Sequence, residues 1–185
     1  MRLRDFGLHP EIRVFNTVSF GPIVTAMGKH DNITCSEYFD DIPAGGHRNG
    51  VRCENLESLS FGNDDLDLVI SEDVFEHLED YKKGFREVYR VLRRGGVHVF
   101  SVPFYFDRKT ENLFTFAEGK AVPLCPIEFH GDPVRGRIPA YTRFGYDLFD
   151  LLSGLGYGVR LDMAQYEDEL RFATFNCSTF VTWKK

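Results

Sequence analysis

Hydrophobic and polar residues follow one another along the chain in segments that have the lengths of strands and helices. Residues 66–71 (LDLVIS) form a nearly continuous apolar run, which is typical of a parallel strand covered on both faces. Residues 79–93 then show apolar side chains at helical spacing, with acidic residues early and basic residues late, and Gly95-Gly96 as a stop. This pattern predicts a central strand followed by a helix.

The rest of the chain continues the alternation. Strands alternating with helices indicate an α/β domain with a mainly parallel sheet. The length of 185 residues fits a single domain over 1–185. Residues 104–140 have no clear periodicity and hold several Pro and Gly, so we expect a long and functional insertion there. The remaining expected strands are 12–20, 32–38, 51–53, 97–102, 159–163 and 178–183, and the remaining expected helices are 23–29 and 146–155.

Charge and composition narrow the classes of partner. A formal net charge of -6 argues against a general affinity for nucleic acid or anionic lipid, and favours a small-molecule substrate. The sequence has no run of the roughly 20 apolar residues that cross a membrane and no secretory signal, so we expect a soluble, cytoplasmic protein. The four cysteines form no C-x-x-C pair, which argues against a zinc knuckle. A homo-oligomer is compatible with the sequence, which does not determine the oligomeric state.

The stretch from Asp64 to Phe104 closely resembles the middle of small-molecule, type 11-like class I S-adenosylmethionine-dependent methyltransferases. In that family an F-D-L-V-type strand leads to an E-H-type loop, a helix ending in R-V-L-K-P-G-G, and another strand. Arg94 stands where the family usually has proline, and a turn can form with the two glycines alone. The resemblance is carried by Asp67, Glu76, His77, Arg90, Leu92, Gly95 and Gly96.

This resemblance implies a Rossmann-like seven-stranded methyltransferase sheet, mostly parallel, with residues 178–183 as an antiparallel last strand. It also implies S-adenosylmethionine as the cofactor, bound at the carboxyl ends of the first strands. Carried over by position, Glu37 ends the second strand and would accept hydrogen bonds from the two ribose hydroxyls. The alternative for Glu37 is a solvated acid at a strand end.

Four further residues are expected at the cofactor by position. Asn55 and Leu56 stand where the family has an acid that receives the adenine amine, and Asn55 could accept through its carbonyl oxygen. Ser71 and Glu72 follow the central strand and would lie beside the methionine part of the cofactor.

The loop after the first strand departs from the family. Its glycines should let the backbone pass close to the cofactor, but residues 14–22 (VFNTVSFGP) retain only Gly21. Two hypotheses follow. The chain is a methyltransferase that binds its cofactor with an unusual first loop, or it is a degenerate member that has lost the cofactor and acts as a binding or scaffolding partner. The first is favoured because Glu37 and the central block are intact.

Candidate chemistry lies in residues 126–133 (PIEFHGDP). His130 could take a proton from a substrate hydroxyl while Asp132 or Glu128 orients its ring, as O-methylation of a small molecule would use. With equal weight, His130 and Asp132 merely hold a Gly-Pro turn. A metal bound by Glu128, His130 and Asp132 is weighed lower, since no complementary His or Cys cluster is visible, and no metal is predicted.

Two other features near this chemistry remain open. His77 is a second candidate base, because imidazole titrates near neutral pH, although the Glu-His pair is more often a loop-packing feature in this family. Arg135, Arg137 and Arg143 could steer an anionic substrate, or they are ordinary surface arginines.

Overall fold

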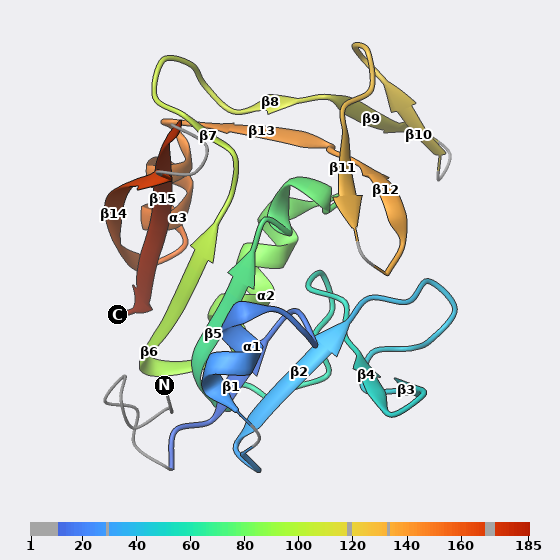
Figure 1. Cartoon of the computed structure of the whole chain (residues 1–185), viewed down its shortest axis with the longest axis vertical. Helices are drawn as coiled ribbons and strands as arrows, with labels where there is room; N and C mark the ends of the chain where they lie inside the picture. The colour runs from blue at the N-terminus through green and yellow to red at the C-terminus, as the bar shows by residue number, and fades with distance from the viewer. Residues whose placement is uncertain (1–10, 29, 118–119, 133, 169–172) are drawn as a thin grey trace.

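The computed structural model describes residues 11–185 apart from 29, 118–119, 133 and 169–172. Its centre is an eight-stranded sheet with the order β14-β15-β6-β5-β1-β2-β4-β3, drawn in Figure 1. The strands of this sheet are β1 (Val14–Asn16), β2 (Ile33–Glu37), β3 (His47–Arg48), β4 (Val51–Cys53), β5 (Leu66–Glu72), β6 (Leu92–Ser101), β14 (Tyr157–Asp168) and β15 (Ala173–Lys184).

The pairing of these strands confirms the predicted architecture. Strands β4, β2, β1, β5 and β6 run parallel to one another, whereas β15 pairs antiparallel with both β6 and β14. The seven expected strands are therefore present, with an antiparallel last strand. The two-residue strand β3 is an addition, paired antiparallel with β4 at the edge of the sheet.

Helices cover the two faces of the sheet unequally. The helices are α1 (Pro22–Met27), η2, a 3-10 turn (Phe75–His77), α2 (Tyr81–Val91) and α3 (Leu148–Gly154). Alternate strand residues face opposite sides, so Phe15 and Val69 pack with α2 and α3 in the main core, while Val14 packs with Met27 of α1. The main core is aromatic, with Phe75 stacked on Phe85 at a centroid distance of 4.1 Å.

Helix α2 lies within the predicted segment and begins and ends for visible reasons. Asp80 caps it by accepting a hydrogen bond from Lys83 N at 2.9 Å. The helix ends at Val91, and Gly95 and Gly96 lie inside β6, where the register shifts against β5. Gly95 has a φ of 77°, and a Cβ on Gly96 would lie 3.0 Å from the carbonyl oxygen of Leu66. The two glycines therefore permit the bend that starts β6.

The insertion differs from the sequence prediction because it is built of short strands and reaches Gly145. Strands of two to four residues are too short to show a periodicity in the sequence. They form two hairpins and a three-stranded sheet that lie beyond the carboxyl ends of β5 and β6 (Figure 1). The strands are β7 (Phe104–Tyr105), β8 (Glu111–Asn112), β9 (Phe114–Ala117), β10 (Lys120–Pro123), β11 (Phe129–Asp132), β12 (Gly136–Pro139) and β13 (Thr142–Gly145).

Other boundaries also moved. Strand β1 has three residues where nine were expected, because the chain turns away into a loop directly after Asn16. Strands β14 and β15 have twelve residues each, longer than predicted, because they pair with each other along their whole length. Among the described residues, no helix combines the length and the apolar character that crossing a membrane requires.

Candidate functional site

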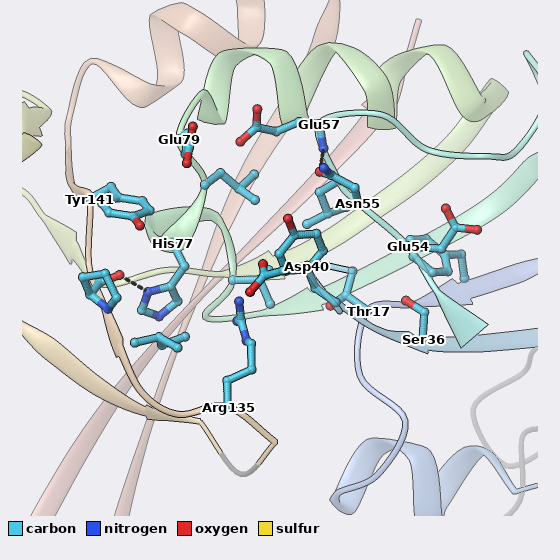
Figure 2. A pocket seen from close by; sticks show the side chains of 17 residues that line it. Thr17, Ser36, Asp40, Glu54, Asn55, Glu57, His77, Glu79, Arg135 and Tyr141 are labelled. Carbon is cyan, nitrogen blue, oxygen red and sulfur yellow. Dashed lines mark hydrogen bonds between the residues drawn. The ribbon is translucent and has the colours of Figure 1, made fainter. Parts of the chain in front are cut away.

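A cavity of about 680 Å³ opens at the carboxyl ends of β1, β2 and β4, under the hairpin β11–β12 of the insertion (Figure 2). The sheet and the loops after its strands contribute one wall, and the η2 turn and the insertion contribute the other. Its side chains from the first wall include Phe15, Thr17, Ser36, Tyr38, Asn55 and Leu56, and those from the second include Val74, His77, Leu78, Arg135, Pro139 and Tyr141.

The charged side chains around this first cavity are mainly acidic. Asp40, Glu57 and Glu79 line it, and Arg135 is the basic residue among its lining side chains (Figure 2). Glu54 also lines the cavity, but it is buried and accepts hydrogen bonds from Arg52 Nε at 2.7 Å and Ser60 N at 3.0 Å. The cavity therefore suits a ligand that carries positive charge.

Tyr38 offers an aromatic face to the same cavity. It follows β2 directly, and burial together with nearby Asp40 raises the pKa of its phenol, so the group stays neutral. The guanidinium carbon of Arg135 lies 5.6 Å from the centre of the Tyr38 ring. Tyr38 and Arg135 thus approach the cavity from its two opposite walls.

Glu37 is engaged with the first loop. Its Oε1 accepts hydrogen bonds from Ser19 N and Ser19 Oγ, both at 2.8 Å. Glu37 is not among the described side chains that line the first cavity, nor does it line the second cavity described below. The contact ties the loop after β1 to the end of β2. A role of Glu37 at the ribose therefore stays a prediction, with one of its two oxygens already occupied.

The first loop itself contains unsatisfied polar groups. Asn16 Nδ2 donates to Val18 O at 2.8 Å, but Asn16 Oδ1 and Thr17 Oγ1 are buried without a hydrogen-bond partner among the described residues. Gly21 ends the loop with a φ of 108°, a conformation that favours glycine, and then begins α1. No protein atom lies within 4 Å of a Cβ built on Gly21, so the turn rather than a close contact requires this glycine.

The other predicted cofactor residues lie in different places. Asn55 and Leu56 line the first cavity, and Asn55 Oδ1 accepts a hydrogen bond from Glu57 N at 2.8 Å (Figure 2). Ser71 is buried in the core, where its hydroxyl is 2.9 Å from His98 Nε2, and it lines neither described cavity. Glu72 lines a second cavity.

This second cavity, of about 390 Å³, adjoins the first and shares lining residues with it, among them His77 and Arg135. It lies between the carboxyl end of β5 and the hairpin β11–β12. Most of its polar lining side chains are acidic or imidazole groups: Glu72, Asp73, Glu76, His77, His130 and Asp132. The arrangement therefore brings His77 and His130, predicted separately, to one place.

Glu76 is the most unusual residue of this second cavity. Its side chain is fully buried, and neither of its oxygens has a hydrogen-bond partner among the described residues. Its Oε1 lies 3.5 Å from His130 Nδ1 and 3.8 Å from His77 Nε2. Burial raises the pKa of Glu76 to about 8, because the charged form is poorly solvated.

The two histidines around Glu76 are held by the insertion. His77 Nδ1 lies 2.7 Å from Pro139 O, and since a carbonyl oxygen can only accept, Nδ1 carries the proton. Burial lowers the pKa of His77, so its ring is neutral and Nε2 presents a lone pair. The His77 and His130 rings meet edge to face, with centroids 4.9 Å apart.

Asp132 and Glu128 were expected to orient the His130 ring, but the structure shows other bonds for both side chains. Asp132 Oδ1 accepts from Val134 N at 2.7 Å and from Arg135 N at 2.6 Å, and its Oδ2 pairs with the Arg135 guanidinium. Glu128 pairs with Arg143. The Asp132 bonds agree with the turn that the sequence left as the alternative, and Glu76 Oε1 lies 3.5 Å from His130 Nδ1.

Known proteins with sequences similar to this chain are described as methyltransferases. The sequence model of a family described as a methyltransferase domain matches residues 32–100. Residues 32–100 are thus similar to this methyltransferase domain family. A probable S-adenosylmethionine-dependent methyltransferase of Mycolicibacterium smegmatis is 37% identical over 77 residues, which cover 42% of this chain and 27% of that relative. The matched stretch thus spans about a quarter of the length of the curated relative.

Solved structures show the methyltransferase fold over nearly the whole chain. An S-adenosylmethionine-dependent methyltransferase from Mesorhizobium loti superposes with a TM-score of 0.55 at 17% identity, covering 97% of this chain and 95% of that one. A putative one from Listeria monocytogenes gives 0.56 at 12% identity, covering 99% and 96%. One from Methanosarcina mazei gives 0.54 at 13% identity, covering 98% and 96%. The predicted Rossmann-like methyltransferase fold is therefore confirmed.

Sequence reasoning missed several residues around the two cavities. Tyr38 and Asp40 follow β2 directly, so their place after a parallel strand was the signal that could have found them. Glu76 was noted only as part of a motif. Its proximity to His130, 54 positions away, depends on the packing of the insertion, which no local pattern indicates.

Proposed function

We propose that this chain is an S-adenosylmethionine-dependent methyltransferase that transfers the methyl group to an oxygen of a small molecule. The observation that carries the proposal is the pair of adjoining cavities at the carboxyl ends of the parallel strands. Open α/β sheets bind their ligands at this edge. The first cavity would hold the cofactor and the second the acceptor.

The first cavity suits the cofactor in size and charge. Its volume of about 680 Å³ lies within the usual range of small-molecule sites, roughly 300–1,000 Å³. S-adenosylmethionine carries a positive sulfonium and a positive ammonium. The acidic side chains that line the cavity, Asp40, Glu57 and Glu79, favour such charges. The face of Tyr38 and the side chain of Leu56 would contact the adenine ring.

The first loop is the unusual part of this site. Thr17 lines the first cavity, and its buried Oγ1 has no hydrogen-bond partner among the described residues, although buried polar atoms normally have partners. A bound cofactor would provide a hydrogen-bond partner near Thr17. This arrangement supports cofactor binding despite the loss of the family glycines.

The second cavity would place the acceptor hydroxyl beside His130. Bound S-adenosylmethionine would supply the methyl group, and His130 would accept the hydroxyl proton as the acceptor oxygen takes that methyl group from the sulfonium sulfur. Alignment of the oxygen with the methyl group supplies much of the rate in such reactions. Arg135, which lines both cavities, would stand close to the transferred group.

Calorimetric titration with S-adenosylhomocysteine tests the cofactor site. We expect one-to-one binding, weakened about five-fold, or about 1 kcal/mol, by Asp40→Asn, because the variant loses one of the acidic charges that line the cavity. Asp41→Asn is the matched control, since Asp41 pairs with Arg48 and does not line the cavity. Absence of binding by the wild type at millimolar ligand would overturn the proposal and favour the scaffolding alternative.

A further inference from the structure

We propose that Glu76, His77 and His130 form a binding site for a divalent transition metal of the zinc type. The three side chains offer one carboxylate oxygen and two imidazole nitrogens, all within 4.8 Å of one another. Glu76 and His77 belong to the η2 turn after β5, whereas His130 comes from β11 of the insertion. Metal binding at this site goes beyond the methyl transfer proposed above, and only the role of the metal toward the acceptor rests on that function.

The first observation concerns the carboxylate. Glu76 is fully buried, and no other described residue gives its two oxygens a hydrogen bond. The ionised form of a carboxyl buried in this way is costly unless a positive group compensates it. The two imidazoles lie 3.5 and 3.8 Å from Glu76 Oε1. A metal ion among the three groups would stabilise the ionised carboxylate.

The second observation concerns the tautomer of His77. Its Nδ1–H donates to Pro139 O at 2.7 Å, so the lone pair of Nε2 faces Glu76 Oε1. The lone pairs of His77 Nε2 and Glu76 Oε1 attract each other only when a proton or a cation lies between them. Metal-binding histidines typically donate their other ring N–H to a backbone carbonyl or a carboxylate, which fixes the ring for the metal. Pro139 O provides this second contact.

The distances fit one metal ion. Ligand atoms bound about 2.1 Å from a zinc ion in tetrahedral geometry lie about 3.4 Å apart. Glu76 Oε1 and His130 Nδ1 are separated by 3.5 Å, and Glu76 Oε1 and His77 Nε2 by 3.8 Å. The two imidazole nitrogens lie within 4.8 Å of each other, so a bound ion would draw the His77 and His130 rings together by up to about 1.4 Å.

Three protein ligands leave a coordination position open, as in catalytic rather than structural zinc sites. All three residues line the second cavity, so the open position would face it. Here the inference rests on the proposed function: an acceptor with an ionisable hydroxyl would bind the metal through that oxygen. The metal would then lower the pKa of the hydroxyl and orient it, so that with the metal bound the proton leaves to solvent and His130 serves as a ligand in place of a base.

The test measures metal binding directly and needs no substrate. Untagged protein is stripped with a chelator, titrated with Zn²⁺ by calorimetry, and loaded with Co²⁺ for its visible absorption spectrum. We expect one ion per chain, with absorption bands from a low-symmetry nitrogen and oxygen site. His130→Ala and Glu76→Gln should each weaken binding by at least about ten-fold, because each removes one of three ligands.

His47→Ala is the matched control, because His47 is an exposed histidine on β3 that is not in the cluster. Loss of binding in this variant, or equal binding by the wild type and His130→Ala, would overturn the site. Since His130 is only partly buried, its variant keeps the test valid if Glu76→Gln fails to fold.

A parallel titration with S-adenosylhomocysteine separates the two proposals. Zinc binding without cofactor binding would overturn the proposed function and leave the metal site standing. Cofactor binding without zinc binding would overturn the metal site alone.

Discussion

The central block and the insertion contribute to the site in different ways. The central block, residues 64–103, is a pair of long parallel strands and a capped helix around an aromatic core. The insertion, residues 104–145, consists of short hairpins with many exposed polar and apolar side chains. Both cavities lie where the two regions meet. The comparison teaches that the block, together with the loops after β1, β2 and β4, fixes where ligands bind, whereas the insertion covers one side of both cavities.

The largest expected difference between the two regions is in stability. Phe85→Ala should lower the free energy of unfolding by about 3–5 kcal/mol, because Phe85 is fully buried and stacked on Phe75. Phe106→Ala in the insertion should cost less than about 1 kcal/mol, since that ring is 55% exposed. Urea unfolding followed by circular dichroism measures both. Equal losses would show that the insertion belongs to the same cooperative core.

A second prediction concerns pH and the core of the block. Burial lowers the pKa of His98 to about 3, whereas the unfolded chain has the ordinary value near 6.5. The native state therefore binds fewer protons than the unfolded state, and stability is complete above pH 6.5 and falls as the pH drops toward 3. Lowering the pH from 7 to 5 should cost about 2 kcal/mol through this residue.

His98→Gln isolates this contribution, because glutamine does not titrate and its amide can still bond to Ser71. Urea unfolding at pH 7 and pH 5 should show a smaller loss for the variant than for the wild type. The same pH dependence in both proteins would assign the loss to other groups.

The smallest expected effect concerns the local stability of hairpin β11–β12 in the insertion. Asp132→Asn weakens the turn of hairpin β11–β12, where Asp132 accepts from two backbone amides and pairs with Arg135. Hydrogen exchange in β12 should become about five-fold faster, while exchange in β5 and β6 stays unchanged.

Asp162→Asn is the control for this hairpin, because Asp162 forms a comparable ion pair with Arg160 on an exposed strand. Faster exchange throughout the sheet in Asp132→Asn would contradict the independence of the hairpin.

The two regions also differ in how far their sequences predicted them. The run 66–71 and the capped helix before Gly95-Gly96 are local patterns, so the central strand, the helix and the fold class followed from them. The insertion lacked such a pattern because its strands are short. Glu37 was predicted at the ribose, and this stays a prediction, but its bonds to Ser19 could not be predicted because they depend on how the first loop folds back.

The residues of the candidate site could also be predicted only where a local pattern or a residue type indicated them. His77 and His130 could be named individually as candidate bases, because their residue type alone suggests the chemistry. Their contact, and the buried Glu76 between them, follow from the packing of two segments more than fifty residues apart. Sequence spacing carries no information on such a contact. The metal alternative was therefore weighed at Glu128, His130 and Asp132, whereas the structure groups His130 with Glu76 and His77.

Two backbone contacts join the insertion to the η2 turn: Tyr141 N donates to Glu76 O at 2.7 Å, and Pro139 O accepts from His77 Nδ1. For protein engineering, this means that the insertion is not an exchangeable module. A chimera that replaced residues 104–145 would leave the Glu76 carbonyl and the His77 ring without these partners, so a graft would have to carry its own Glu-His turn. The η2 turn and the hairpin would therefore have to be exchanged together.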